Sequence, residues 1–166
     1  KFYESYFRKE HSLLFSKKIM IFPHTSKIDT TALAGMRHLG GFISNLQLES
    51  GAIPSNQDGS HDPWDHLEAV MGLATLSFNH EAVLGLQWMK DNQNEDGSWY
   101  NLYQGNEAID KNKQSNFSSY IAVAVWQNYL LTNDLSILEN FWSSIEKGMV
   151  FALSLQRSNG AIAWNV

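Results

Sequence analysis

The chain has 166 residues, of which 43% are hydrophobic and 13% aromatic, and it carries a formal net charge of −5. A sequence of this length and hydrophobicity favours one globular domain and excludes a disordered chain. The absence of cysteine excludes disulfides and every cysteine-containing metal site, and it favours a cytoplasmic location.

Helical hairpins are expected along most of the chain. We expect residues 1–30 to form an N-terminal arm or helix, and residues 31–166 to form a domain of about three hairpins. The clearest helix start is Asp62-Pro63, where a capping carboxylate precedes a proline at the first helical position. The other expected caps are Asn79, Ser115 or Asn116, and Asp134. The expected helices are Thr31–Leu48, Pro63–Leu76, Asn79–Met89, Phe117–Leu131 and one that follows Asp134.

The helix expected over Phe117–Leu131 is apolar on nearly all sides, which is typical of an inner layer buried on both faces. The large aromatic residues outside the candidate site are expected to belong to the core. These residues are Trp88, Trp126, Tyr129 and Trp142, and Trp99 is expected to pack between hairpins.

A seven-residue pattern that occurs three times is the strongest sign of internal repetition. It consists of Gln, two variable residues, a turn-forming Ser, Asp or Asn, then Gly, a small residue and a large apolar residue. The copies are Gln47–Ile53, Gln93–Trp99 and Gln156–Ile162. Glycine after a helix supplies the left-handed conformation that ends it, and the glutamine can bond exposed carbonyls or the next repeat. The pattern therefore predicts one helical hairpin per repeat.

Several segments resemble known families. Gln93-Asn-Glu-Asp-Gly-Ser-Trp99 resembles the Gln–Trp repeat of squalene (terpenoid) cyclases and their prenyltransferase-like relatives, and residues 51–166 resemble bacterial prenyltransferase-like proteins. Residues 133–151 are similar to the hairpins of six-hairpin glycosidases. Both resemblances imply an all-α fold, an α/α toroid with a central cleft. Such toroids need about six hairpins and this chain offers about three, so we expect a partial or half toroid.

The segment Asp58–Glu68 is the richest in polar chemistry, and it leads into the first turn of a predicted helix. Carboxylates beside an aromatic ring suit glycoside hydrolysis, in which one acid protonates the leaving oxygen while its partner activates water or attacks. The candidate catalytic residues are Asp62, Asp65 and Glu68, and the candidate substrate-binding residues are His61, Trp64 and His66. The resemblance to six-hairpin glycosidases makes Asp65 or Glu68 the candidate acid. A purely structural role stays open, because acids also cap helices and favour the first helical turn.

A second candidate cluster, Asn116 and Tyr120, lies at the start of the predicted inner helix. In a toroid this helix end opens onto the same cleft as residues 61–68, so both side chains can bind a substrate hydroxyl group. The alternative is a helix cap beside a core tyrosine. His61, Asp65 and His66 lack the geometry of metal ligands, so we expect no metal and no cofactor.

Charge narrows the set of partners. Residues 1–40 hold seven Lys/Arg against three Asp/Glu, and residues 41–166 hold five against fourteen. The excess of negative charge in residues 41–166 repels a phosphate backbone, so we expect no nucleic-acid partner. The longest apolar stretch, Tyr120–Trp126, is too short to cross a bilayer, so we expect no membrane span.

Three functions stay open at this point. The first is a toroid whose acidic and aromatic cleft binds carbohydrate and, if it is an enzyme, hydrolyses it like a glycoside hydrolase. The second is an isoprenoid-binding protein of the prenyltransferase type, in which Met71, Trp126 and Tyr129 line an enclosed tunnel. The third is a helical scaffold that binds protein. A half toroid leaves inner apolar surface exposed, so we expect a homo-oligomer or association with the missing half.

Overall fold

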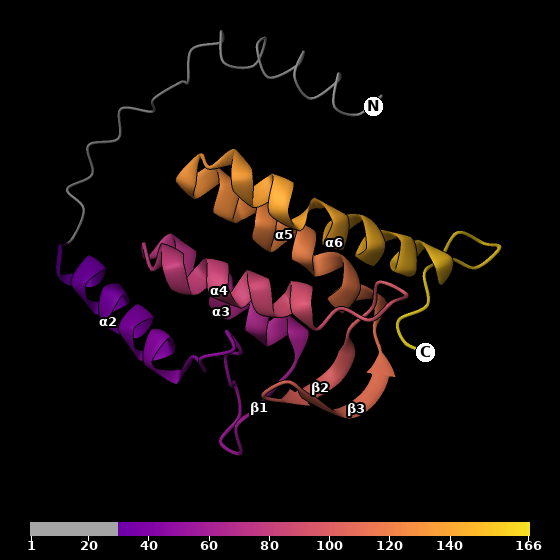
Figure 1. The fold of residues 1–166 in the computed structure, drawn as a ribbon, viewed down its shortest axis with the longest axis horizontal. Coiled ribbons are helices and arrows are strands. Elements are labelled where there is room, and N and C mark those ends of the chain that lie inside the picture. The colour runs from indigo at the N-terminus through magenta and orange to yellow at the C-terminus, as the bar shows by residue number, and fades with distance from the viewer. Residues whose placement is uncertain (1–29) are drawn as a thin grey trace, which may run out of the picture. The chain divides into compact units, whose positions relative to one another are not determined.

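Five helices and a small sheet make up the computed structural model, which describes residues 30–166 (Figure 1). The arm or helix expected over residues 1–30 falls outside this range except for Thr30. The elements in chain order are α2 (Thr30–Leu46), β1 (Ser60–His61), α3 (Pro63–Thr75), α4 (Asn79–Asp91), β2 (Tyr100–Gln104), β3 (Glu107–Lys113), α5 (Ser115–Thr132) and α6 (Leu135–Ser154). All five helices that the sequence predicted are present, with ends that differ by a few residues.

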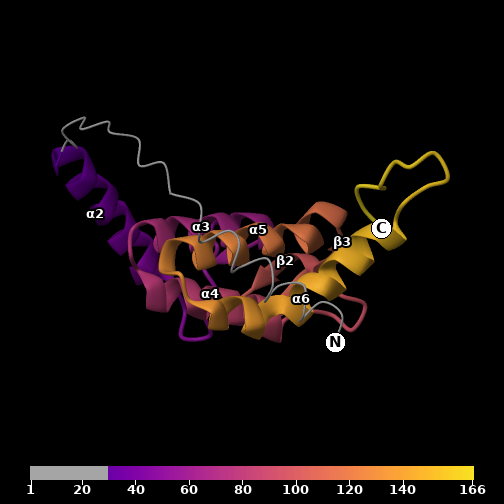
Figure 2. The ribbon, with the colours of Figure 1, turned by 90° about the horizontal axis from the view of Figure 1, so that it is seen from above.

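The helices after α2 form two hairpins arranged in two layers. Helix α3 packs against α4, α5 packs against α6, and α3 packs against α5. Helices α3 and α5 therefore share one layer, and α4 and α6 share the other (Figure 2). This is the side-by-side hairpin arrangement from which α/α toroids are built, and closure into a toroid stays a prediction.

Helix capping agrees with the sequence at two of the four predicted positions. Asp62 caps α3, where its Oδ1 accepts a hydrogen bond from Asp65 N at 2.8 Å, and Asp134 caps α6 by accepting from Ser136 N at 3.0 Å. The other two predictions were wrong. Asn79 is the first residue of α4, and α5 begins after Gln114, with no side-chain hydrogen bond at either cap.

The sheet corrects the all-α prediction, because the chain is mostly helical with three short antiparallel strands in the order β1-β2-β3. Strand β1 pairs His61 with Tyr103 of β2. Strands β2 and β3 carry the polar sequences YNLYQ and EAIDKNK, which have little of the β-branched or alternating character that predicts strands. Strand β1 runs into α3 and β3 into α5, so the sheet fixes the first turns of both inner helices at one end of the layer (Figure 1).

All three repeat turns form, and they share one hydrogen bond. The glutamine Nε2 of each turn, at Gln47, Gln93 and Gln156, donates to the carbonyl of the turn glycine at 3.0 Å. The three glycines have φ of +93°, +89° and +86°. Residues that carry a Cβ rarely adopt these backbone angles. Gln47 and Gln93 also donate to carbonyls in the layer formed by α4 and α6, whose helices we call outer helices. The acceptors are Glu81 O of α4 and Ser144 O of α6, each at 2.9 Å. These two turns therefore tie neighbouring repeats together, through a carbonyl of a helix and not of the loop that the sequence suggested.

The core is centred between the two layers. Trp88 and Tyr129 are buried as predicted, and Trp99 is fully buried, with its Nε1 donating to Met89 O at 2.7 Å. Trp126 and Trp142 are 48% and 39% exposed, so the prediction that they belong to the core was wrong. Helix α5 is accordingly buried on one side only, because no described helix covers its other face.

Candidate functional site

An aromatic pair and a carboxylate meet where the first turns of α3 and α5 lie side by side. The rings of Trp64 and Tyr120 stack with centroids 3.9 Å apart and an interplanar angle of 6°. Trp64 Nε1 donates to Glu68 Oε1 at 2.8 Å, and Tyr120 Oη donates to the same oxygen at 3.4 Å. One of these donors is four positions from Glu68 and the other 52, and together they hold its exposed carboxylate in a defined orientation.

Two further carboxylates lie near Glu68 at the start of α3. Asp65 is exposed, and Asp62 is half-buried at the helix cap. Burial raises the pKa of Asp62 above its usual value, and the negative charges of Asp65 and Glu68 add to this rise against the hydrogen bond from Asp65 N. A half-buried acid with a raised pKa beside exposed carboxylates is an arrangement suited to proton transfer.

The two histidines of this segment are fully buried, and their predicted contact with substrate stays a prediction. His66 is fully buried; its Nδ1 accepts from Ile53 N at 3.2 Å and its Nε2 lies 3.0 Å from Gly85 O. His61 is also fully buried, between the rings of Trp88 and Tyr103, and neither of its ring nitrogens has a hydrogen-bond partner among residues 30–166. Burial lowers the pKa of His61 to about 4 and that of His66 to about 3.

Asn116 lies one turn before Tyr120 on α5 and is half-buried. Within the described range, its Oδ1 is buried without a hydrogen-bond partner. A carbonyl oxygen in this state is available to a donor such as a hydroxyl group. The structure thus places Asn116 on the same helix as Tyr120, one turn nearer its start.

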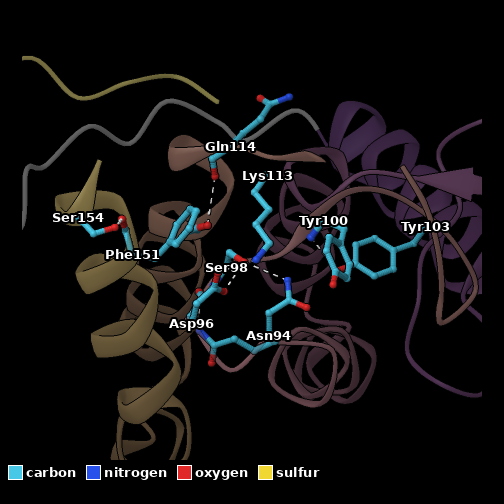
Figure 3. A network of polar contacts seen from close by, with 12 residues as sticks. Asn94, Asp96, Ser98, Tyr100, Tyr103, Lys113, Gln114, Phe151 and Ser154 are labelled. Carbon is cyan, nitrogen blue, oxygen red and sulfur yellow. Dashed lines mark hydrogen bonds and ion pairs between the residues drawn. The ribbon is translucent and has the colours of Figure 1, made fainter. Parts of the chain in front are cut away.

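A polar hollow on the second repeat turn was not predicted from sequence. It has a volume of about 370 Å³ and is lined by Asn94, Glu95, Asp96, Tyr100 and Lys113. Lys113 Nζ lies 2.5 Å from Asp96 Oδ2 and 5.6 Å from the centre of the Tyr100 ring (Figure 3). Burial alone would raise the pKa of Asp96, but hydrogen bonds from Lys113 and Ser98 outweigh it and hold that pKa below its usual range.

The turn that lines this hollow contains a sequence motif that also occurs in an earlier turn. Asn56-x-Asp58-Gly-Ser60 and Asn94-x-Asp96-Gly-Ser98 make the same bonds, since each serine Oγ donates to the aspartate and accepts from the asparagine. The turn at 56–60 is a fourth copy of the repeat-turn geometry. It was missed because Ser55 stands where the other copies have glutamine.

Residues 30–166 contain no cluster of metal ligands and no helix that could span a membrane. No group of three His, Asp or Glu side chains lies close enough together to hold a metal ion. None of the helices in that range combines the length and the hydrophobicity that a bilayer span requires. The isoprenoid alternative placed Trp126 and Tyr129 in an enclosed tunnel, whereas Trp126 is exposed and Tyr129 is buried in the core.

Comparison with known proteins relates this chain to glycosidases. Over 122 residues it is 35% identical to the MMP endo-(1,4)-3-O-methyl-alpha-D-mannosidase of Mycolicibacterium hassiacum. The alignment covers 74% of the chain and 34% of the mannosidase, so the chain spans about a third of that relative's length. No family model matches the chain. The likeness to a carbohydrate-acting protein is consistent with the glycosidase side of the predicted resemblance, while the prenyltransferase side and the cytoplasmic location stay predictions.

Proposed function

We propose that this chain supplies part of the cleft of an α/α-toroid glycosidase that binds and hydrolyses α-mannosides. The observation that carries the proposal is the cluster of Trp64, Glu68 and Tyr120, in which two aromatic side chains orient one carboxylate. Flat aromatic faces next to acids are what a sugar site requires, because the rings stack on the sugar while the acids act on the glycosidic bond.

Roles for the carboxylates follow from their surroundings. Asp62 is our candidate proton donor, because it is half-buried beside two other carboxylates and burial raises its pKa in the direction that a general acid requires. Glu68 and Asp65 are exposed, and Glu68, fixed by Trp64, is our candidate for activating water or attacking the sugar. Asn116 and Tyr120 are the candidate partners of substrate hydroxyl groups.

The relative suggests a substrate class. Its name describes an enzyme that cleaves within chains of 3-O-methyl-α-D-mannose joined by 1,4 linkages. Methyl ethers make a mannose chain more apolar, which suits a binding surface that contains the Trp64 and Tyr120 rings. We therefore propose an α-1,4-linked, O-methylated mannoside as the substrate class of the site.

Glu68→Gln and Asp62→Asn are expected to lower hydrolysis of a 3-O-methylmannose oligosaccharide by about 10²–10⁴-fold, the usual contribution of an acid or base. Both substitutions keep the side-chain shape, and asparagine also caps helices, so the fold is retained. Hydrolysis is followed by chromatography of the products, and binding by the rise in melting temperature that a ligand of the folded state produces.

Two matched controls separate chemistry from capping and charge. Asp134→Asn changes an equivalent cap on α6, and Glu139→Gln removes an exposed carboxylate of the same helix. Both are expected to behave like the parent protein. Equal loss of activity in the controls, or stabilisation by isoprenoid diphosphates and by no saccharide, would refute the proposed glycan site.

A further inference from the structure

The third repeat turn, Gln156–Ile162, lacks the neighbour that the first two have. In those turns, Gln47 and Gln93 each donate a second hydrogen bond, at 2.9 Å, to a carbonyl of the next outer helix. Gln156 Nε2 donates to Gly160 O of its own turn, and no outer helix within residues 30–166 lies against it. The turn therefore forms by itself, and its second contact is missing.

The glycines of the turns give an independent measure of the same contact. A Cβ added to Gly51 would lie 2.3 Å from Leu84 O, and one added to Gly97 would lie 2.2 Å from Lys147 O. The same addition at Gly160 meets nothing within 4 Å. The first two turns are thus pressed against a helix backbone so closely that only glycine fits, while the third has open space at the equivalent position.

The apolar residues that end the turns also differ in burial between the first two turns and the third. The apolar residue that ends each turn is buried in the first two, at 3% exposure for Ile53 and 0% for Trp99, whereas Ile162 is 44% exposed. At the end of α6 that leads into this turn, Met149 and Leu153 are also exposed, at 40% and 54%. Exposed apolar side chains gathered in this way are typical of an interaction surface.

The helix that would fit this surface can be described from the two contacts already present. In α4 the two contacted carbonyls belong to residues twelve and nine positions before Gln93, namely Glu81 and Leu84. In α6 they belong to residues twelve and nine positions before Gln156, namely Ser144 and Lys147. The third turn therefore needs an outer helix that presents two backbone carbonyls three residues apart.

Helix α2 has this pair of positions free. Twelve and nine positions before Gln47 lie Gly35 and His38, both exposed, and a Cβ added to Gly35 meets nothing within 4 Å. Beside them, Met36, Leu39 and Phe42 are 47%, 60% and 61% exposed. Among the three glutamine–glycine turns, the third thus lacks a helix within the described residues, and α2 lacks a turn at these two positions.

We propose that two copies of this chain associate head to tail, with the third turn of each copy packed on Gly35 and His38 of α2 in the other. The contact would repeat the two that the chain already makes, which is why we assign it to a second copy. A pair related by a twofold axis contains this contact twice and forms a closed assembly. The proposal is independent of the glycosidase activity proposed above.

Light scattering after size-exclusion chromatography tests the proposal on the 166-residue chain. We expect a mass twice the 18.9 kDa of one copy. Ile162→Asp and Gly35→Arg are each expected to weaken association by about tenfold or more, since each places a charge at the centre of the contact. Both positions are exposed within one copy, so the melting temperature of the dilute protein should not change. The matched control is Ile109→Asp on β3, where the isoleucine is 50% exposed and away from the contact.

Mixing the two variants tests the head-to-tail arrangement directly. A pair of identical variants has an altered residue in both of its contacts. In a mixed pair, the Gly35→Arg copy supplies an unaltered third turn and the Ile162→Asp copy supplies an unaltered α2, so one contact stays intact. We expect the mixture to form dimers that the separate variants do not form. A monomeric parent, an unchanged dimer in Ile162→Asp or the absence of dimers in the mixture would each overturn the proposal.

Discussion

Gly97→Ala is expected to lower the free energy of unfolding by about 2–6 kcal/mol, a large share of the stability of a domain this size. Two costs add. Alanine at the φ of +89° found here is strained by about 1–3 kcal/mol, and its Cβ would lie 2.2 Å from Lys147 O, which forces α6 away from the turn at a further cost of about 1–3 kcal/mol. Urea unfolding followed by circular dichroism measures the change.

Gly160→Ala is the matched control for this substitution. Its φ of +86° is nearly the same, but its Cβ meets nothing within 4 Å. At protein concentrations at which the parent is monomeric, we expect only the backbone cost of about 1–3 kcal/mol. The difference between the two variants measures the contact between the second turn and α6. Equal destabilisation by both would contradict the packing described for Gly97.

Acidification is expected to destabilise the protein strongly between pH 6.5 and pH 3. Burial lowers the pKa of His61 to about 4 and of His66 to about 3, whereas an unfolded histidine titrates near 6.5. Below pH 6.5 the unfolded state therefore binds more protons than the folded state, so stability falls as the pH falls. Full stability is present above pH 6.5, and the loss by pH 3 is on the order of 5–8 kcal/mol for the two histidines together.

Urea unfolding at a series of pH values tests this expectation, and His61→Phe identifies the group responsible. Both ring nitrogens of His61 are buried without partners among the described residues, so an apolar ring of similar shape should keep or raise stability at pH 7. The same variant should flatten the pH dependence between pH 6.5 and pH 4. His80→Phe, at an exposed position of α4, should leave the profile unchanged. A His61→Phe profile identical to that of the parent would rule out His61 as a source of the acid sensitivity.

The candidate site divides between features that sequence spacing predicts and features that it does not. Asp62 caps α3 and Asp65 lies in its first turn, as the Asp62-Pro63 helix start predicts, because capping involves residues three positions apart. Sequence placed His61 and His66 beside them as substrate-binding residues. Whether a histidine faces solvent or core depends on what packs against its ring, and here Trp88 and Tyr103 come from α4 and β2.

Sequence by itself determined the features that depend on a few consecutive residues. The three glutamine–glycine turns and the caps Asp62 and Asp134 are of this kind, because each is held by hydrogen bonds that span two to four positions. The positions of the five helices follow from their apolar spacing in the same way.

Only the tertiary structure decided which surfaces meet. The stacking of Trp64 on Tyr120, the pairing of polar strands β2 and β3 and the exposure of Trp126 on an apolar helix all depend on contacts with distant segments. The turns make the reason plain, since three nearly identical local structures differ in burial only because two of them have a helix against them. Local hydrogen bonds are encoded within a single turn, whereas burial is a property of the neighbours that the whole fold supplies.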